Sequence, residues 1–160
     1  TPLFCDPVST SKATKLSGLL GHFHAMKPNA LEAEALTGVT IHDEKSLELA
    51  AKKLLDTGLE QVFISLGADG LLCAGQDGML RLPSYSADVV SATGSGDAMM
   101  GAIIWAHLQG EDLEGACAAG LAVAAICTES ASTVNPNLTA EAVRQRMAEA
   151  GATGKVLSAN

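Results

Sequence analysis

The stretch VVSATGSGDAMMGAI (residues 89–103) passes from a polar, glycine-rich turn into an almost wholly apolar segment. Asp97 stands where a helix is expected to begin, and the residues after it are apolar on every side of that helix. We therefore expect a buried helix over residues 96–107. Its first backbone N–H groups, which the small residues Gly94–Gly96 leave accessible, would face a site inside the domain, which is how helices bind phosphate.

Asp97 and the glycines before it allow several interpretations. The simplest is an ordinary helix start, because acidic residues suit the positive end of the helix dipole. A Walker loop is excluded because no lysine lies nearby, and a dinucleotide fingerprint fails because Met99 stands where a third glycine is required. A carboxylate opposes static binding of an anion, but it fits a group that takes a proton from a hydroxyl attacking phosphorus. The stretch thus favours phosphoryl transfer to an alcohol.

The composition limits the class of protein. The chain has 160 residues, of which 48% are hydrophobic, and this suits one folded domain rather than a disordered segment. The formal net charge of −8 argues against a nucleic-acid partner. No apolar run approaches the ~18 residues of a membrane span, and the first residues do not resemble a signal peptide. We therefore expect neither a nucleic-acid nor a membrane partner.

Cysteines and histidines give no metal signal. The chain has four cysteines at scattered spacings, namely Cys5, Cys73, Cys117 and Cys127. We interpret them as buried free thiols, which fits a reducing, cytoplasmic location. His22 and His24 alternate, but no further ligand stands at a known spacing nearby, so we interpret them as residues of a strand.

Periodicity and turn residues predict alternating short strands and helices. The expected strands cover residues 3–6, 22–27, 61–66, 71–74, 79–82 and 88–90. The expected helices cover residues 12–20, 29–38, 46–56, 96–107, 113–128 and 140–150. This alternation predicts an α/β protein with a largely parallel sheet.

The opening stretch resembles the C-terminal signature of the ribokinase-like (PfkB) carbohydrate kinases, an Asp-Thr-x-Gly-Ala-Gly-Asp run that enters a helix. The resemblance implies a three-layer α/β/α fold. It also implies that Asp97 is the catalytic base and that Gly94, Ser95 and Gly96 form the anion hole. Residues 91–92 are Ser and Ala, where the family usually has Asp and Thr, and those positions help to hold a monovalent cation. Dependence on potassium therefore stays open.

Asn29 and Glu32 are spaced as in a capping box, and that interpretation is sufficient by itself. The resemblance adds that an Asn-x-x-Glu element orders water around the Mg²⁺ that bridges the ATP phosphates. We favour this functional interpretation, with Mg²⁺ keeping most of its own waters.

The run SLGADG (residues 65–70) is by itself a turn after a strand. The resemblance implies that Ser65, Gly67 and Gly70 contact the ribose and phosphates of ATP. It further implies that residues 120–130 belong to a helix on the adenine side of the nucleotide.

Asp6 and Lys12 follow the first expected strand, and we expect both to face the phosphate side of the site, where Lys12 could approach a phosphate.

The implied activity is transfer of the ATP γ-phosphoryl group to a primary hydroxyl of a sugar or nucleoside. Four stretches are most similar to family members that phosphorylate pseudouridine: residues 4–16, 24–38, 94–101 and 135–138. Ribokinase, fructokinase and adenosine kinase types are the alternatives within the family. The family's early Gly-Gly motif and its lid over the sugar are not found in the sequence, so residues 1–160 are interpreted as the C-terminal part of such a kinase. A catalytically incomplete nucleotide-binding fragment and a homodimer both stay open.

Overall fold

The structure is a computed structural model that describes residues 1–132, 135–151 and 155–157. The strands are β1 (Phe4–Cys5), β2 (Ala25–Met26), β3 (Gln61–Ser65), β4 (Leu71–Gly75), β5 (Gly78–Leu82) and β6 (Lys155–Leu157). The α-helices are α1 (Thr10–Ala13), α2 (Ala30–Thr37), α3 (Glu44–Leu55), α4 (Ser95–Leu108), α5 (Leu113–Thr128) and α6 (Ala140–Ala150). Short 3₁₀ helices cover Thr14–Leu16, Leu20–His22 and Gly67–Asp69.

The chain divides into two compact units, which are described one at a time. The first unit consists mainly of Thr1–Leu66 and Leu72–Leu80. The second consists mainly of Gly67–Leu71 and Arg81–Lys155.

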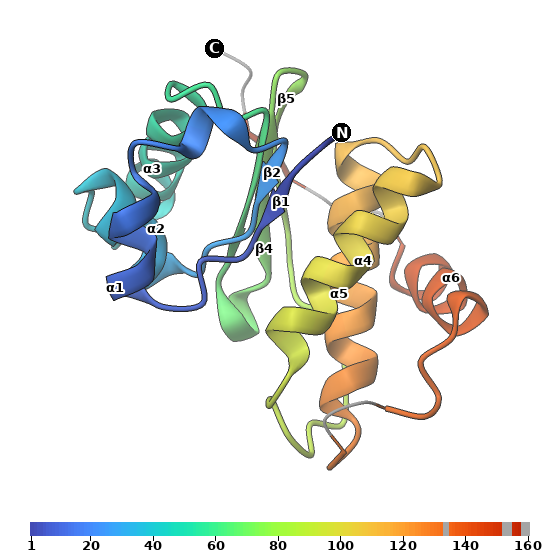
Figure 1. Ribbon diagram of the computed structural model, residues 1–160. Coiled ribbons are helices and arrows are strands. Elements are labelled where there is room, and N and C mark those ends of the chain that lie inside the picture. Colours follow the sequence, from blue (N-terminus) through green and yellow to red (C-terminus); the bar gives the residue numbers. More distant parts are fainter. Residues whose placement is uncertain (133–134, 152–154, 158–160) are drawn as a thin grey trace. The chain divides into compact units, whose positions relative to one another are not determined.

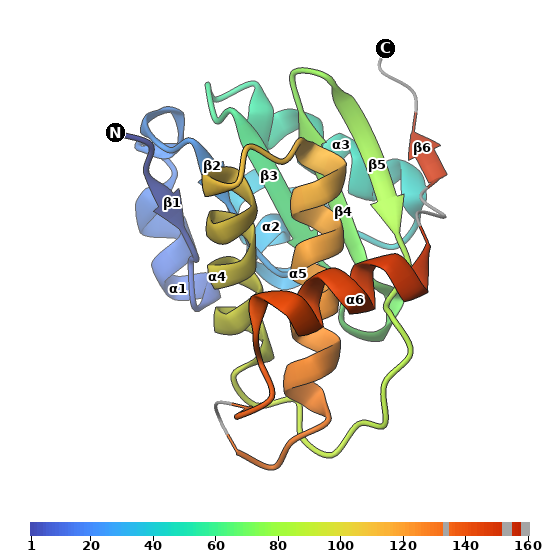
Figure 2. The ribbon, with the colours of Figure 1, turned by 90° about the vertical axis from the view of Figure 1, so that its right-hand side faces the viewer.

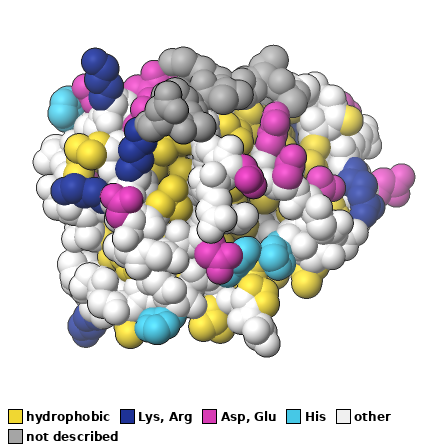
Figure 3. Space-filling model, turned by 90° about the horizontal axis from the view of Figure 1, so that it is seen from above, with side chains coloured by type: hydrophobic (Ala, Val, Ile, Leu, Met, Phe, Trp, Pro, Cys, Tyr) yellow, Lys and Arg dark blue, Asp and Glu magenta, His cyan; other side chains and the backbone are white. Residues whose placement is uncertain are grey.

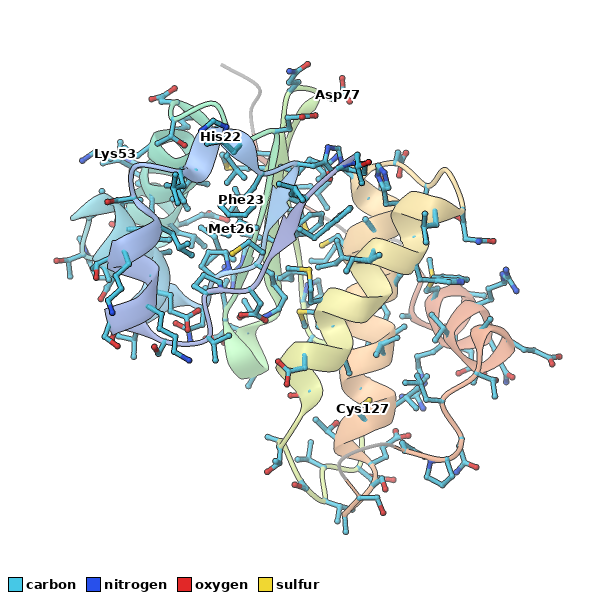
Figure 4. All side chains as sticks on the ribbon, in the orientation of Figure 1. His22, Phe23, Met26, Lys53, Asp77 and Cys127 are labelled. Carbon is cyan, nitrogen blue, oxygen red and sulfur yellow. The ribbon has the colours of Figure 1, made fainter. Side chains whose placement is uncertain are left out.

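The sheet belongs mainly to the first unit and has the strand order β1-β2-β3-β4-β5-β6. β1, β2 and β3 are parallel, with Phe4 opposite Ala25 and Met26 opposite Val62. Only two residues join β4 to β5, so these strands form an antiparallel hairpin. Asp77, labelled in Figure 4, lies in that turn. The predicted α/β class with a largely parallel sheet is confirmed.

Helices α2 and α3 pack against β3 in the first unit. Figure 1 shows both helices on the same side of the sheet. Val62, Phe63 and Ile64 are all fully buried, as is typical of a strand that is covered on both faces. Met26 belongs to the same core and Phe23 packs against it, whereas Lys53 of α3 lies outside that core (Figure 4). The apolar residues at helical spacing in α3 supply the matching buried side.

Three helices dominate the second unit. Figure 2 shows α4 and α5 side by side, with α6 packed against α5. The small residues of α5 permit this close approach, because a Cβ added at Gly120 would lie 3.1 Å from Cγ of Met99. Burial of α5 extends to its last turn, where Cys127 lies (Figure 4).

Three predicted elements are wrong. The strand expected over residues 22–27 covers only Ala25–Met26, so His22, which lies in a 3₁₀ helix, and His24 are not residues of a strand. The helix expected over residues 12–20 ends at Ala13 and gives way to 3₁₀ turns, because the hydroxyls of Thr14 and Ser17 donate to nearby backbone carbonyls and compete with helix formation. The strand expected over residues 88–90 is absent from a segment that the structure fully describes. The Val90 N–H instead donates to the carbonyl of Thr128 at 2.7 Å, which ties this segment to the end of α5. The sequence analysis also does not anticipate β6.

The cysteine interpretation is correct in part. Cys5 and Cys127 are free thiols, as expected. Cys73 and Cys117 are disulfide-bonded, which contradicts the prediction for these two residues. Spacing along the chain does not reveal which sulfurs a fold brings within bonding distance, and this explains the error.

Charged side chains are dispersed over the face of the molecule seen in Figure 3, where acidic and basic groups alternate with uncharged surface. Within the described residues, no helix combines the length and the apolar character that crossing a membrane requires.

Candidate active site

The carboxyl ends of the parallel strands bring several predicted site residues together in the first unit. Asp6 directly follows β1, and Asn29 follows β2 after a short connection. Asn29 forms a parallel bridge with Ser65 at the end of β3, where the Ser65 N–H donates to the Pro28 carbonyl at 2.9 Å. This edge of an open α/β sheet is the usual place for a ligand.

Asp6 forms an ion pair with Lys27, a residue that the sequence analysis does not single out. The Nζ of Lys27 lies 2.9 Å from Oδ2 of Asp6, and the two side chains are 5% and 19% exposed. The register of β1 and β2 explains the pairing, because Cys5 stands opposite Met26 and each charged residue comes one position later. A lysine this deeply buried needs a counter-charge, and Asp6 supplies it.

Lys12 does not join this pair. Its side chain is exposed on α1, which Ser9 caps by accepting the Lys12 N–H. The cation beside Asp6 is therefore Lys27 rather than the lysine that stands near it after the first strand.

The environment of this pair affects the neighbouring cysteine. Burial, and then the negative charge of Asp6, raise the pKa of the Cys5 thiol. The thiol is therefore protonated at neutral pH and is a poor nucleophile.

Asn29 and Glu32 form a complete capping box at the start of α2. The Asn29 Oδ1 accepts the Glu32 N–H, and the Glu32 Oε2 accepts the Asn29 N–H, both at 2.9 Å. Glu32 is only 4% exposed. The simple capping interpretation is thus confirmed, while the magnesium role stays a prediction.

The donor types at this box suit Mg²⁺ only in part. Carboxylate and amide oxygens are hard ligands of the kind that Mg²⁺ takes. The single side-chain oxygen of Asn29 and one carboxylate oxygen of Glu32 are already engaged, and the described residues contain no cluster of three or more His, Cys, Asp or Glu that could hold a metal ion. The arrangement therefore fits a hydrated ion approached through water, not an ion enclosed by the protein.

The glycine loop Gly67–Gly70 begins the second unit. Residues 67–69 form a 3₁₀ turn, and the Gly70 N–H donates to the Gly67 carbonyl at 3.2 Å. Gly70 has φ +96°, and an added Cβ would lie 2.8 Å from two backbone atoms of Pro83. Only glycine fits there, so the loop passes directly against the end of β5.

The start of α4 has the features expected of an anion-binding turn. Gly94 is the N-cap residue with φ +82°, and no side chain caps the helix. A side chain does cap the first turn of the other described α-helices. The Ser95 hydroxyl donates backward to the Ala92 carbonyl at 2.8 Å, so it does not occupy the N–H groups of the first turn. The Ser95 N–H also donates to the Ala92 carbonyl, at 3.4 Å, so the first-turn N–H groups that no described residue accepts are those of Gly96 and Asp97.

Asp97 lies in this first turn with an exposed side chain. The expectation that α4 is buried on every side is therefore wrong: Gly96, Asp97 and Gly101 are exposed, while the buried residues are Met99, Met100, Ala102, Ile103 and Ala106. The composition of α4 predicts too much burial because Gly and Ala count as apolar residues whether they are buried or exposed. The exposed carboxylate can meet a substrate directly.

A cavity of about 620 Å³ lies elsewhere in the second unit, between the end of α5 and α6. Its lining includes Asp88, Asn135 and the ion pair in which Arg146 donates twice to Glu129, both at 3.0 Å. Ile126, Glu129 and Ser130, from the stretch predicted to lie on the adenine side, also line it, whereas none of the residues predicted to contact the phosphates or to act as the base does.

Comparison with known proteins places the chain in a family. The model of the pfkB family of carbohydrate kinases matches residues 1–140. Pseudouridine kinase of Escherichia coli (strain K12) is 35% identical over 102 residues, which are 62% of this chain and 32% of that protein. The 1-phosphofructokinase of the same strain is 33% identical over 143 residues, which are 88% of this chain and 46% of the relative.

A solved structure shares the fold. The crystal structure of a candidate sugar kinase from Clostridium perfringens matches with a TM-score of 0.89 at 28% identity, over 97% of this chain and 48% of the other. The fold is thus that of the ribokinase-like kinases, and the chain belongs to the pfkB carbohydrate kinase family. The matched part makes up less than half of each of these three proteins.

Proposed function

We propose that this chain provides the nucleotide side and the catalytic base of a kinase that transfers the ATP γ-phosphoryl group to a primary hydroxyl of a sugar or nucleoside. The observation that carries the proposal is the start of α4, where an uncapped first turn and the exposed carboxylate of Asp97 occur together. Family membership supports the reaction type.

The uncapped turn would act on charge. The turn at Gly94–Gly96, where no described residue accepts the N–H groups of Gly96 and Asp97, would point a positive partial charge toward the phosphoryl group as it moves, and the dipole of α4 would add to this. Gly94 takes the left-handed conformation that opens the turn, and no side chain crowds these donors. They would stabilise negative charge without first having to reorient.

Asp97 would act on the proton. Its carboxylate takes the proton from the acceptor hydroxyl while that oxygen bonds to phosphorus and the bond to the ADP oxygen breaks. The proton then resides on Asp97, and ADP leaves with the electron pair of the broken bond. The described residues offer the carboxylate no hydrogen bond or ion pair, so nothing in them competes for the proton.

The strand ends of the first unit and the glycine loop of the second unit would each serve the nucleotide. Ser65, with Gly67 and Gly70 after it, is proposed to contact the ribose and phosphates. Asn29 and Glu32 are proposed to orient water around Mg²⁺, which when bound shields the charge of the polyphosphate. Asp6 is proposed to hold Lys27 in place at the same strand ends, while the approach of Lys12 to a phosphate stays a prediction.

Pseudouridine is the acceptor that we favour, because a pseudouridine kinase is among the relatives and the matching stretches surround the predicted site. A phosphorylated or free hexose is the second candidate, because a 1-phosphofructokinase is 33% identical over 143 residues. A panel of pseudouridine, ribose, fructose and fructose 1-phosphate distinguishes them.

The first test is calorimetric titration of MgATP into the chain, repeated with EDTA. Magnesium-dependent binding supports the proposal, and no binding to the folded chain contradicts it. The second test is Asp97→Asn, which we expect to lower turnover about 10²- to 10⁴-fold with MgATP affinity nearly unchanged. Glu141→Gln is the matched control, because Glu141 is also an exposed carboxylate in the first turn of a helix and belongs to the same unit. If the chain binds MgATP but phosphorylates no acceptor, it is a nucleotide-binding fragment.

A further inference from the structure

The loop Gly67–Gly70 is held on one side by two side chains from the end of β5. Arg81 donates from Nη2 to the Asp69 carbonyl at 2.9 Å. Ser84 donates from Oγ to the Gly67 carbonyl, also at 2.9 Å. Two of the loop's carbonyl oxygens are thus fixed by donors from a segment that lies 12 to 17 positions later in the sequence.

Fixing a carbonyl also fixes the next N–H group. In a trans peptide the C=O and N–H bonds point in opposite directions. Because the Gly67 carbonyl points at Ser84, the Ala68 N–H points away from Ser84. The same geometry turns the Gly70 N–H away from Arg81 and back toward the Gly67 carbonyl, which accepts it.

Arg81 brings positive charge as well as a hydrogen bond. Its Nε is buried and has no hydrogen-bond partner among the described residues, so the guanidinium is anchored to the loop through Nη2. The chain as a whole has a net charge of −8, so a polyphosphate must rely on local positive groups. A guanidinium fixed at the loop is one such group.

Backbone contact leaves the loop little room to move. The end of β5 passes so close to Gly70 that no Cβ fits between them. Arg81 and Ser84 therefore act on a loop whose position is already limited, and what they control is the orientation of its peptide groups.

We propose that Arg81 and Ser84 are positioning residues that hold the peptides of Gly67–Gly70 in the orientation that receives the phosphates of ATP. This inference rests on the proposed function, because it assigns the nucleotide to this loop. The sequence analysis identifies the loop but neither of the two residues that hold it.

The test compares MgATP with adenosine, which lacks phosphates, as ligands of the full chain. The variants are Arg81→Met and Ser84→Ala. Arg81→Lys serves as the conservative variant, and Ser86→Ala is the matched control because Ser86 is exposed in the same segment. Amide hydrogen exchange at Gly67–Gly70 without nucleotide reports on the loop itself.

We expect Arg81→Met to weaken MgATP binding by at least about tenfold and Ser84→Ala by about fivefold, with a clearly smaller loss for adenosine, which keeps the ribose but has no phosphates. Arg81→Lys retains the charge but not the planar fork, so it should weaken MgATP binding less than Arg81→Met. Exchange in the loop should rise in Arg81→Met and Ser84→Ala, and Ser86→Ala should match the wild type throughout.

Three results overturn the inference separately from the proposed function. They are wild-type MgATP affinity in both Arg81→Met and Ser84→Ala, unchanged exchange in the loop, or equal losses for MgATP and adenosine. The last result would show a general structural role. If Arg81→Met does not fold, Ser84→Ala decides the matter alone. Absence of MgATP binding to the wild-type chain overturns the proposed function and this inference with it.

Discussion

Removing the charge of Asp6 should cost more stability than removing the charge of Lys27. The two side chains form one ion pair, 2.9 Å apart, but they are buried to different degrees: Lys27 is 5% exposed and Asp6 is 19% exposed. An ion that stays in the interior without its partner is strongly unfavourable, whereas an ion that reaches water recovers part of its hydration.

The structure gives a magnitude for each variant. Asp6→Asn leaves the Lys27 ammonium buried without a counter-charge, and we expect a loss of about 2–3 kcal/mol, at the lower end for a broken buried pair because the amide oxygen still accepts from Nζ. Lys27→Met keeps an apolar stem and leaves Asp6 partly hydrated and accepting the Val8 N–H, so we expect about 1 kcal/mol. The double variant has no buried charge at this position, and we expect it to cost about 1–2 kcal/mol.

Urea unfolding of the four chains measures these values and completes a double-mutant cycle with a coupling energy of about 2 kcal/mol. The loss for Asp6→Asn should also lower Tm by roughly 5–10 °C in a chain of this size. Equal losses in the two single variants, or a coupling below about 0.5 kcal/mol, would show that the pair is solvated and that the burial argument fails.

Three further variants test other parts of the fold. Gly101→Ala should stabilise the chain by about 0.5–1 kcal/mol in thermal unfolding, because Gly101 is inside α4 and nothing lies within 4 Å of an added Cβ; a loss would show that the glycine is needed. Gly70→Ala should destabilise by about 3 kcal/mol or more, because φ is +96° and the Cβ meets the backbone of Pro83; a change under about 1 kcal/mol would contradict this close approach. Hydrogen bonds from the side chain and backbone of Ser46 lower the pKa of Asp43, so its contribution is complete above the ordinary pKa of 3.8 and is lost as pH falls through the lowered value. Asp43→Asn should therefore lose less Tm than the wild type on acidification below that pH, and identical losses would contradict the assignment.

The sequence predicts best the elements whose ends carry local signals. Helix α2 begins after Asn29 and ends before Gly38, as expected, because a capping box and a left-handed glycine act within a few residues. Helix α5 has the predicted bounds as well. The segment after α1 was mispredicted because Thr14 and Ser17 bond to local carbonyls, and apolar periodicity does not register that competition.

Features of the candidate site that depend on one short stretch of sequence were predicted. Features that depend on which strands pair were not. The uncapped turn before Asp97 follows from adjacent residues. The pairing of Asp6 with Lys27 requires the register of β1 on β2, and the contacts of Arg81 and Ser84 require the return of β5 to the glycine loop. Lys12 was expected at the phosphate side because it follows the first strand closely, whereas Lys27 was not singled out because its approach to Asp6 depends on the pairing of two strands.

The end of β1 combines two locally unfavourable features, and their coincidence supports a functional role for this strand end. Val8 is a β-branched residue with φ +66°, a conformation that costs about 1–3 kcal/mol and is kept only when the surroundings impose it. Its N–H donates to Oδ1 of Asp6, whose other oxygen holds the buried Lys27, so the strained turn and the buried charge share one carboxylate. An apolar pair in place of Asp6 and Lys27, followed by an unstrained turn, would cost less free energy on folding. A chain usually breaks such local rules at a site that needs a fixed polar group, and this break lies at the sheet edge that carries Asn29 and Ser65.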